Sequence, residues 1–180
     1  MLRLTAAAIL GLHILLLAAC TSAPKRPASG GLPPAQVQKL KSMRLPGSLP
    51  LPVGNAQRQA LQDTWGASRS RGRAHEGIDI LAPRGTKVYS ATDGLIADLR
   101  SNNLGGKVVW IIGPAGSWHY YAHLDGHKRG LNVGDSIKKG DLIGYVGSTG
   151  NSTGNHLHLE VWKGGSKANA VNPRGYIPIR

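Results

Sequence analysis

Short runs of β-forming residues, separated by glycine-containing turns, fill the chain from about residue 58 onward. The candidate strands are 77–81, 87–91, 95–99, 107–112, 117–123, 142–146 and 157–162. Because this region has no long apolar stripe of helical period, we predict an all-β fold, with residues 58–180 forming a single compact domain on an antiparallel sheet. The chain has no phenylalanine, so the four tryptophans are expected to pack in the core.

The N-terminal segment has the layout of a secretory signal. Arg3 precedes an apolar stretch, residues 4–17, and two alanines lead to Cys20. The stretch is too short for a membrane-spanning helix of about 20 residues, so we predict a cleaved signal peptide, residues 1–19. Residues 17–20, Leu-Ala-Ala-Cys, resemble the lipobox of bacterial lipoproteins, in which the cysteine is lipidated. Cys20 is therefore the expected membrane anchor.

The lipobox resemblance implies a location in the cell envelope. Thr21 rather than aspartate follows Cys20, which in Gram-negative sorting implies the outer membrane, with the domain facing the periplasm. Cys20 is the one cysteine of the chain, so stability must come from the core or from metal rather than from a disulfide. The alternative is an ordinary exported protein whose cysteine stays unmodified.

Residues 20–57 are expected to form a flexible linker. Seven prolines lie between positions 24 and 52, and no acidic residue lies between positions 21 and 57. Such a composition favours extended, semi-rigid chain that holds a domain away from its anchor. Residues 35–44 can form a short helix, but with too few apolar positions for a core element. The same linker could fold across an active site and inhibit it.

The mature chain is strongly basic. Loss of Arg3 leaves 21 of the 22 Lys and Arg against 9 Asp and Glu, a formal charge of +12. Such a field concentrates anionic polymers, which in an envelope means cell-wall material or anionic lipid head groups. Nucleic acid is the weaker candidate, because the basic residues are spread along an exported chain, and we expect no nucleic-acid partner.

Histidines and one aspartate indicate a zinc site. The candidates are His75, Asp79, His123, His156 and His158. Zinc accepts neutral imidazole and carboxylate, and a catalytic zinc takes three such ligands and keeps a fourth position for water. His156 and His158 are two apart in a candidate strand, so their side chains should project from the same face.

The segment 75–79, His-Glu-Gly-Ile-Asp, allows two metal-site interpretations. In the first it imitates the helical His-Glu-x-x-His motif, with Glu76 as general base and Asp79 replacing the second histidine. A glycine, two isoleucines and a nearby proline disfavour that helix. The preferred interpretation puts His75 at a loop edge and Asp79 on an adjoining strand, with no role for Glu76.

Three further histidines, at 119, 123 and 127, are spaced by four, but residues 118–123 are aromatic and strand-like. On a strand His119 and His123 would share a face. Asp125-Gly126 would then turn the chain and leave His127 in an exposed loop. We place only His123 in the site and expect structural roles for the other two.

Six segments, in order and spacing, resemble the lysostaphin-like, or LytM-type, zinc metallopeptidases that cut peptidoglycan cross-links. The matching segments are Trp65-Gly66, His75-Glu76-Gly77-Ile78-Asp79-Ile80, Ala82-Pro83-Arg84-Gly85-Thr86, Tyr121-Ala122-His123-Leu124, Gly144-Tyr145-Val146-Gly147-Ser148-Thr149-Gly150 and His156-Leu157-His158-Leu159-Glu160. The resemblance covers residues 65–176 and implies a duplicated-hybrid-motif-like β domain with one zinc. By this resemblance His75, Asp79 and His158 hold the zinc, and His123 and His156 lie beside it as catalytic histidines.

This division of roles agrees with elementary chemistry. Three protein ligands, one of them anionic, leave a positively charged metal whose bound water can ionise near pH ~7. The water attacks a peptide carbonyl, and the developing charge and the leaving amine need hydrogen-bond and proton donors. His123 and His156 can supply both, and the sequence leaves open which of them is the general base.

The expected function is zinc-dependent hydrolysis of peptidoglycan cross-links. For a Gram-negative host the resemblance implies a D,D-endopeptidase that cuts the D-alanyl to diaminopimelate bond, and for other walls a glycine bridge. The main alternative is a non-catalytic LytM-type regulator that activates cell-wall amidases, although such relatives usually lack one of the five site residues. A basic binding module on the same fold would leave the histidines and aspartate unexplained.

Overall fold

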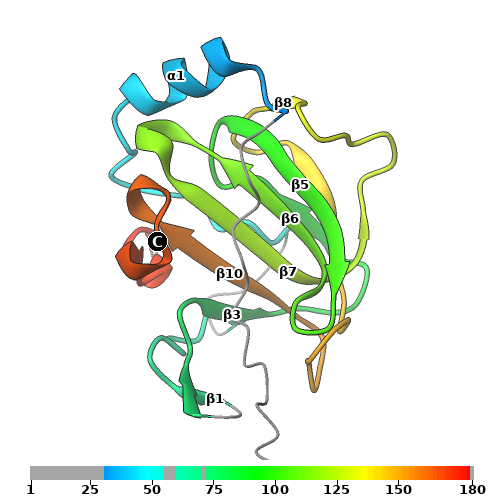
Figure 1. Cartoon of the computed structure of the whole chain (residues 1–180). Coiled ribbons are helices and arrows are strands. Elements are labelled where there is room, and N and C mark those ends of the chain that lie inside the picture. Colours follow the sequence, from blue (N-terminus) through cyan, green and yellow to red (C-terminus); the bar gives the residue numbers. More distant parts are fainter. Residues whose placement is uncertain (1–30, 55–59, 70–71, 179–180) are drawn as a thin grey trace, which may run out of the picture.

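The computed structural model describes residues 31–54, 60–69 and 72–178. The domain consists mostly of antiparallel strands, which confirms the predicted all-β class (Figure 1). Its strands are β1 (Ser68–Arg69), β2 (Arg73–Ala74), β3 (Ile78–Leu81), β4 (Lys87–Tyr89), β5 (Gly94–Asn102), β6 (Gly106–Ile112), β7 (Trp118–His127), β8 (Ser136–Ile137), β9 (Leu142–Val146), β10 (His156–Trp162) and β11 (Ala170–Val171). The helical elements are α1 (Pro34–Ser42) and the short 3₁₀ turns η3 (Pro114–Gly116), η4 (Lys163–Gly165), η5 (Lys167–Asn169) and η6 (Pro173–Gly175).

One nine-stranded sheet forms the framework of the domain. Its main path runs β11-β10-β7-β6-β5-β8. β3 pairs with the N-terminal part of β10, and β9 pairs with both β4 and β7. β1 and β2 form a separate two-stranded hairpin. The seven predicted strands are all present. The two-residue strands were not predicted, because two residues are too few to show an alternating pattern.

Alternation along the long strands divides the buried side chains between two cores. On β10, Leu157, Leu159 and Val161 face the larger, aliphatic core. The opposite side of the sheet packs a tryptophan-rich core, in which Trp110 lies 4.9 Å from Trp162 and 6.0 Å from Trp118 between ring centroids. Burial of each such side chain contributes about 1.5–3 kcal/mol. These three tryptophans therefore meet the expected packing role, whereas the fourth, Trp65, is half-buried and belongs to neither core.

The flexible-linker prediction is wrong for residues 31–54. Helix α1 lies across one end of the sheet, and its Val37 and Leu40 are buried in the tryptophan-rich core (Figure 1). Leu49 and Val53 enter the aliphatic core, where the Leu49 amide donates to the Tyr176 carbonyl at 2.7 Å. A few apolar side chains suffice here because the domain offers them an apolar surface to cover. The predicted signal peptide and Cys20 lie outside the described residues.

Strand β7 continues through the predicted turn at Asp125-Gly126. It runs to His127, which is half-buried, with Nε2 3.0 Å from the Val108 carbonyl oxygen, so the exposed-loop prediction for His127 is wrong. Irregular pairing with β9 accommodates the Asp-Gly pair within the strand.

Within the described residues, no helix has the length and apolar character needed to cross a membrane.

Candidate metal centre

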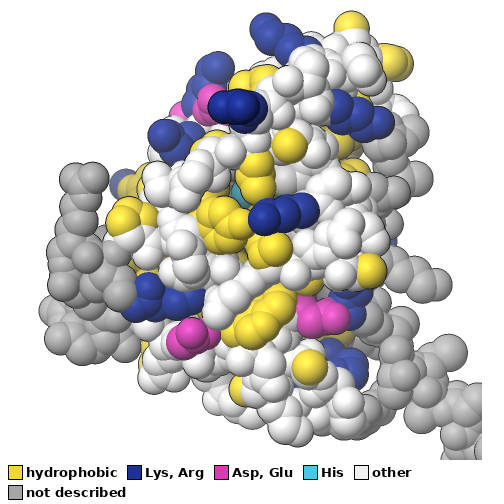
Figure 2. All heavy atoms as spheres, turned by 90° about the vertical axis from the view of Figure 1, so that its left-hand side faces the viewer, with side chains coloured by type: hydrophobic (Ala, Val, Ile, Leu, Met, Phe, Trp, Pro, Cys, Tyr) yellow, Lys and Arg dark blue, Asp and Glu magenta, His cyan; other side chains and the backbone are white. Residues whose placement is uncertain are grey.

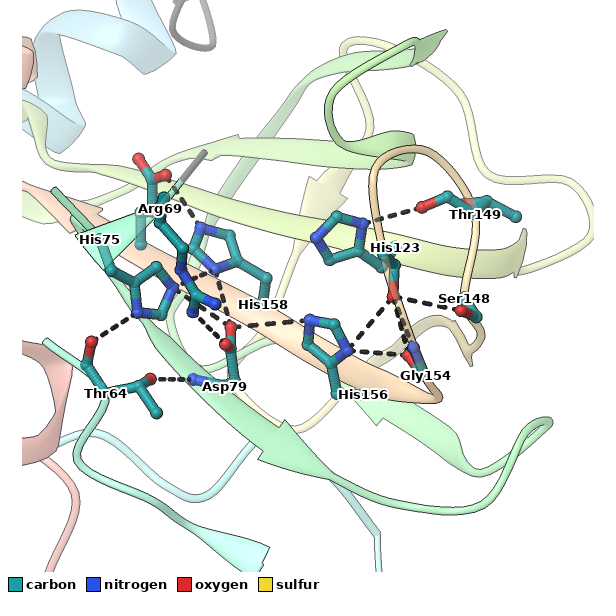
Figure 3. Close-up of polar contacts among 12 residues, drawn as sticks. Thr64, Arg69, His75, Asp79, His123, Ser148, Thr149, Gly154, His156 and His158 are labelled. Atoms are coloured by element: carbon teal, nitrogen blue, oxygen red, sulfur yellow. Dashed lines mark hydrogen bonds and ion pairs between the residues drawn. The ribbon is translucent and has the colours of Figure 1, made fainter. Parts of the chain in front are cut away.

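A cleft of about 490 Å³ lies between the β1–β2 hairpin and the face of β7 and β10 that carries Ala122 and His158. All five predicted site residues, namely His75, Asp79, His123, His156 and His158, line it. The described residues of the former linker, 31–54, contribute nothing to its walls. Figure 3 shows the five side chains pointing toward one another from β3, β7, β10 and the loop before β3.

Three side chains converge as metal ligands would. The register of β3 and β10 places Asp79 directly opposite His158, and His75 precedes β3. Asp79 Oδ1 lies 3.0 Å from His158 Nδ1 and 3.2 Å from His75 Nε2, and these two nitrogens are 2.8 Å apart. Ligands at about 2.0–2.2 Å around a tetrahedral zinc lie about 3.3–3.6 Å from each other. A small shift of each atom therefore accommodates the ion.

His75 is oriented by a backbone carbonyl. Its Nδ1–H donates to the Thr64 carbonyl oxygen at 2.7 Å, because a carbonyl can only accept, and Nε2 is left to face Asp79. The Thr64 hydroxyl also accepts from the Asp79 amide at 3.0 Å. One threonine thus holds two of the three ligands (Figure 3). Such supporting contacts fix ring orientation and tautomer in metal sites.

The local field favours a cation. Burial would raise the pKa of Asp79, but hydrogen bonds from His158 and His75 hold it well below its usual range. Burial would lower the pKa of His158, but hydrogen bonds to Asp79 and Glu160 raise it to about 9. The second carboxylate oxygen of Asp79, Oδ2, pairs with Arg69. Two imidazoles and an ionised carboxylate form a donor set that suits zinc, so these residues fit the predicted ion.

His123 and His156 lie beside this triad, with ring centroids 4.7 Å apart. His123 Nδ1–H donates to the Thr149 carbonyl at 2.8 Å, and His156 Nδ1–H donates to the Gly154 carbonyl at 2.9 Å. Each contact turns Nε2 away from the supporting loop, and His156 Nε2 lies 3.6 Å from Asp79 Oδ1. Burial is the main reason that the pKa of His123 falls to about 4 and that of His156 is also lowered.

A β-bulge brings His123 into the cleft. Opposite a single residue of β6, Val108, strand β7 carries two, Ala122 and His123. His123 adopts a φ of 62°, and its amide donates to the Gly105 carbonyl at 2.7 Å. The extra residue shifts the alternation, so His123 leaves the face it would share with His119 on a regular strand. The predicted common face of these two residues is therefore wrong.

The remaining candidates have structural positions. His119 is fully buried with Nε2 3.1 Å from the Ser117 hydroxyl, in line with its expected structural role. Residues 75–79 form a loop and a strand, which excludes the helical motif with Glu76 as base. Glu76 instead forms an ion pair with Lys167 at the cleft wall.

Four supporting residues were missed from the sequence: Thr64, Arg69, Thr149 and Glu160. Glu160 could have been found, because it lies two positions after His158 on the same strand and so shares its face. Thr64 and Thr149 orient His75 and His123 through backbone carbonyls, which leave no signal in the amino-acid pattern.

An antiparallel β domain with a His-Asp-His centre and two further histidines in the same cleft defines a metallopeptidase type of site. The model of Peptidase family M23 matches residues 73–173, and the chain belongs to this family. The predicted LytM-type resemblance is thereby confirmed.

Two curated relatives are similar over the domain. The L-Ala--D-Glu endopeptidase of Bacillus subtilis is 34% identical over 125 residues, which cover 64% of this chain and 38% of the relative. The peptidoglycan DD-endopeptidase ShyC of Vibrio cholerae is 38% identical over 88 residues, covering 49% of this chain and 20% of the relative. The chain thus spans less than two fifths of either relative.

Two solved structures have the same fold. Lysostaphin from Staphylococcus simulans superposes with a TM-score of 0.58 at 30% identity, over 65% of this chain and 48% of the other. A zinc-containing peptidase from Vibrio cholerae gives a TM-score of 0.54 at 31% identity, over 66% of this chain and 37% of the other.

Proposed function

We propose that this protein is a zinc-dependent peptidoglycan endopeptidase that hydrolyses peptide cross-links. The observation that carries the proposal is the convergence of His75 Nε2, Asp79 Oδ1 and His158 Nδ1 within one cleft, with two non-ligand histidines at its side. Zinc held by these three residues, one ion per domain, supplies Lewis-acid chemistry: it polarises a peptide carbonyl and makes water a nucleophile near neutral pH.

The two remaining histidines handle protons in this proposal. With Nδ1–H committed to a backbone carbonyl, each neutral imidazole presents an unprotonated Nε2 that can accept a proton. One of the pair takes a proton from the attacking water and, as the imidazolium so formed, delivers that proton to the leaving amine. The other stabilises charge on the carbonyl oxygen when it is protonated, because Nε2 then carries a hydrogen that it can donate. His123 and His156 are equally supported for the base, because both have the same supporting contact.

The proposed bond is the D-alanyl to diaminopimelate cross-link, which makes the activity that of a D,D-endopeptidase. Support comes from the relative named as a peptidoglycan DD-endopeptidase. The relative named as an L-Ala--D-Glu endopeptidase supplies the competing bond, within a stem peptide. Arg69, Arg73 and Lys167 line the cleft and suit the carboxylates that wall peptides carry.

Charge on the outer surface supports a polymeric, anionic substrate. Figure 2 shows Lys and Arg side chains spread over one face, among hydrophobic and neutral ones, with few acidic groups. This distribution agrees with diffuse attraction to cell-wall material rather than a single tract for nucleic acid. The regulatory alternative, activation of an amidase, is less favoured because all five site residues are in place.

We further propose that Cys20 is lipidated and anchors the domain to the outer membrane, on its periplasmic side. The support is the sequence at residues 17–20. Metabolic labelling with a clickable fatty acid should mark the parent protein and not Cys20→Ser. Equal labelling of both would contradict the anchor.

Digestion of purified sacculi tests the proposed activity. Residues 21–180 are incubated with sacculi in zinc and, separately, after chelation, and the muropeptides are separated by mass spectrometry. We expect zinc-dependent loss of cross-linked dimers with the parent and none with His123→Ala. Products cut between L-alanine and D-glutamate would correct the bond, and no cleavage by folded, zinc-loaded protein on several wall types would favour the amidase-activator alternative.

A further inference from the structure

His158 offers Nδ1 to the metal position, whereas His75 offers Nε2. The hydrogen bond made by Nε2 of His158 determines that Nδ1 faces the metal position. Nε2 lies 2.9 Å from Glu160 Oε1, and because a carboxylate accepts, the hydrogen sits on Nε2. Glu160 faces the same side of β10 two residues further along the strand.

Glu160 is itself held on its second oxygen. The Trp162 indole Nε1–H donates to Oε2 at 2.7 Å, so the row His158, Glu160, Trp162 forms a chain of two hydrogen bonds. Glu160 is 4% exposed and Trp162 is 1% exposed, and the Trp162 and Trp110 rings are in a T-shaped arrangement. A carboxylate at such depth is costly unless both oxygens are paired. Both are paired here, by two donors of fixed direction.

We propose that Glu160, fixed by Trp162, is a positioning residue that sets the tautomer and ring orientation of His158 and so controls zinc affinity. Without the carboxylate, the imidazole can carry its hydrogen on Nδ1 or rotate Nε2 toward the metal, and the three ligand atoms no longer converge. Removal of such a supporting group typically lowers metal affinity about 10–100-fold. The inference rests on the metal centre and not on the identity of the substrate.

Glu160→Gln is the sharpest variant. Glutamine keeps the size of the side chain but has one acceptor oxygen and one amino group, so it cannot satisfy both the His158 and the Trp162 donors. Zinc affinity is measured on the purified full-length mature chain by competition with a chromophoric chelator. We expect about 10–100-fold weaker binding, and a changed visible absorption spectrum of the Co²⁺-saturated protein, which reports ligand geometry.

Glu76→Gln is the matched control. It also neutralises a carboxylate at the cleft wall, beside the ligand His75, but that carboxylate pairs with Lys167 and touches no ligand. Its zinc affinity should stay within about twofold of the parent, because no ligand loses a hydrogen-bond partner. Trp162→Phe removes the indole donor together with part of the buried ring, leaves the Glu160 carboxylate in place, and should weaken zinc binding less than Glu160→Gln, while giving a similar shift in the Co²⁺ spectrum.

The proposal is overturned if Glu160→Gln binds zinc within twofold of the parent with an unchanged Co²⁺ spectrum, or if Glu76→Gln weakens binding as much. Should Glu160→Gln fail to fold by circular dichroism, Trp162→Phe decides, and parent-like affinity and spectrum there would refute the role. A parent that binds zinc tightly but cuts no sacculi would refute the proposed function alone, so the two failures are distinguishable.

Discussion

The carbonyl oxygen of Thr149 accepts from His123 Nδ1 at 2.8 Å, and the hydroxyl of the same threonine links two neighbouring segments. That hydroxyl donates to the Leu124 carbonyl at 2.8 Å and accepts from the Lys107 amide at 2.9 Å. Gly106 and Gly150 pack closely around it, since a Cβ on Gly150 would lie 2.2 Å from the Gly106 nitrogen. Thr149 therefore ties the loop before β10 to the bulge that carries His123.

Thr149→Val should lower kcat about 10–100-fold while zinc affinity stays unchanged. Valine keeps the volume but loses both hydroxyl contacts, so the carbonyl that orients His123 shifts, and small misplacements at a reacting centre are costly. Thr86→Val is the control, because its hydroxyl donates only to the Pro83 carbonyl, outside the cleft. Equal kcat for Thr149→Val and the parent would remove Thr149 from the positioning of His123.

Variants of the metal ligands and variants of the catalytic histidines should differ in zinc binding and in kcat. Asp79→Ala and His158→Ala should lose tight zinc binding, because each removes one of three ligand atoms. His123→Ala and His156→Ala should keep zinc and lose about 10²–10⁴-fold in kcat, the usual contribution of a proton-transfer group. Zinc is measured by titration calorimetry and kcat on a cross-linked peptide. Loss of zinc from His123→Ala would contradict the division of roles.

His119 should make the fold sensitive to acid. Burial lowers the pKa of His119 from 6.5 to about 4. Between these values the unfolded chain binds a proton that the folded one does not, so the free energy of unfolding falls as pH drops from about 6.5 to 4, by up to about 3 kcal/mol. His119→Gln should lose less stability over this range in urea unfolding at pH 7 and pH 4. Parallel losses in both proteins would show that His119 does not contribute.

Helix α1 should stabilise the domain through Leu40. Leu40→Ala removes a side chain that is 8% exposed in the tryptophan-rich core, and we expect a loss of about 2–3 kcal/mol in the free energy of unfolding. Met43→Ala, at a position that is 39% exposed, should change it by less than about 0.5 kcal/mol. Similar small effects from both would mean that the segment is detached from the domain in solution.

Strands and ligands were predictable from local pattern. Residues 108–112 are a continuous apolar run and residues 157–161 alternate apolar and polar side chains, and both patterns are typical of a buried strand, as observed. The His-x-His spacing likewise fixes a shared face for His156 and His158. The family resemblance then selected His75, Asp79 and His158 as the ligands, which meet in the structure.

Long-range contacts were not predictable in the same way. The bulge at Ala122 and His123 depends on the positive φ of His123, and a non-glycine residue at that position gives no sequence signal for such a φ. Helix α1 has only two buried apolar side chains, and the tryptophans that they cover are distant in sequence. The support of His75 by Thr64 uses a backbone oxygen, which every residue possesses.

The most direct test of the metal centre is an anomalous difference map at the zinc edge from crystals of the mature domain grown with zinc. We expect one strong peak about 2.0–2.2 Å from His75 Nε2, Asp79 Oδ1 and His158 Nδ1, with His123 and His156 outside bonding distance. A peak bound by His123 or His156, or no peak between the three ligands, would contradict the zinc centre proposed for this chain.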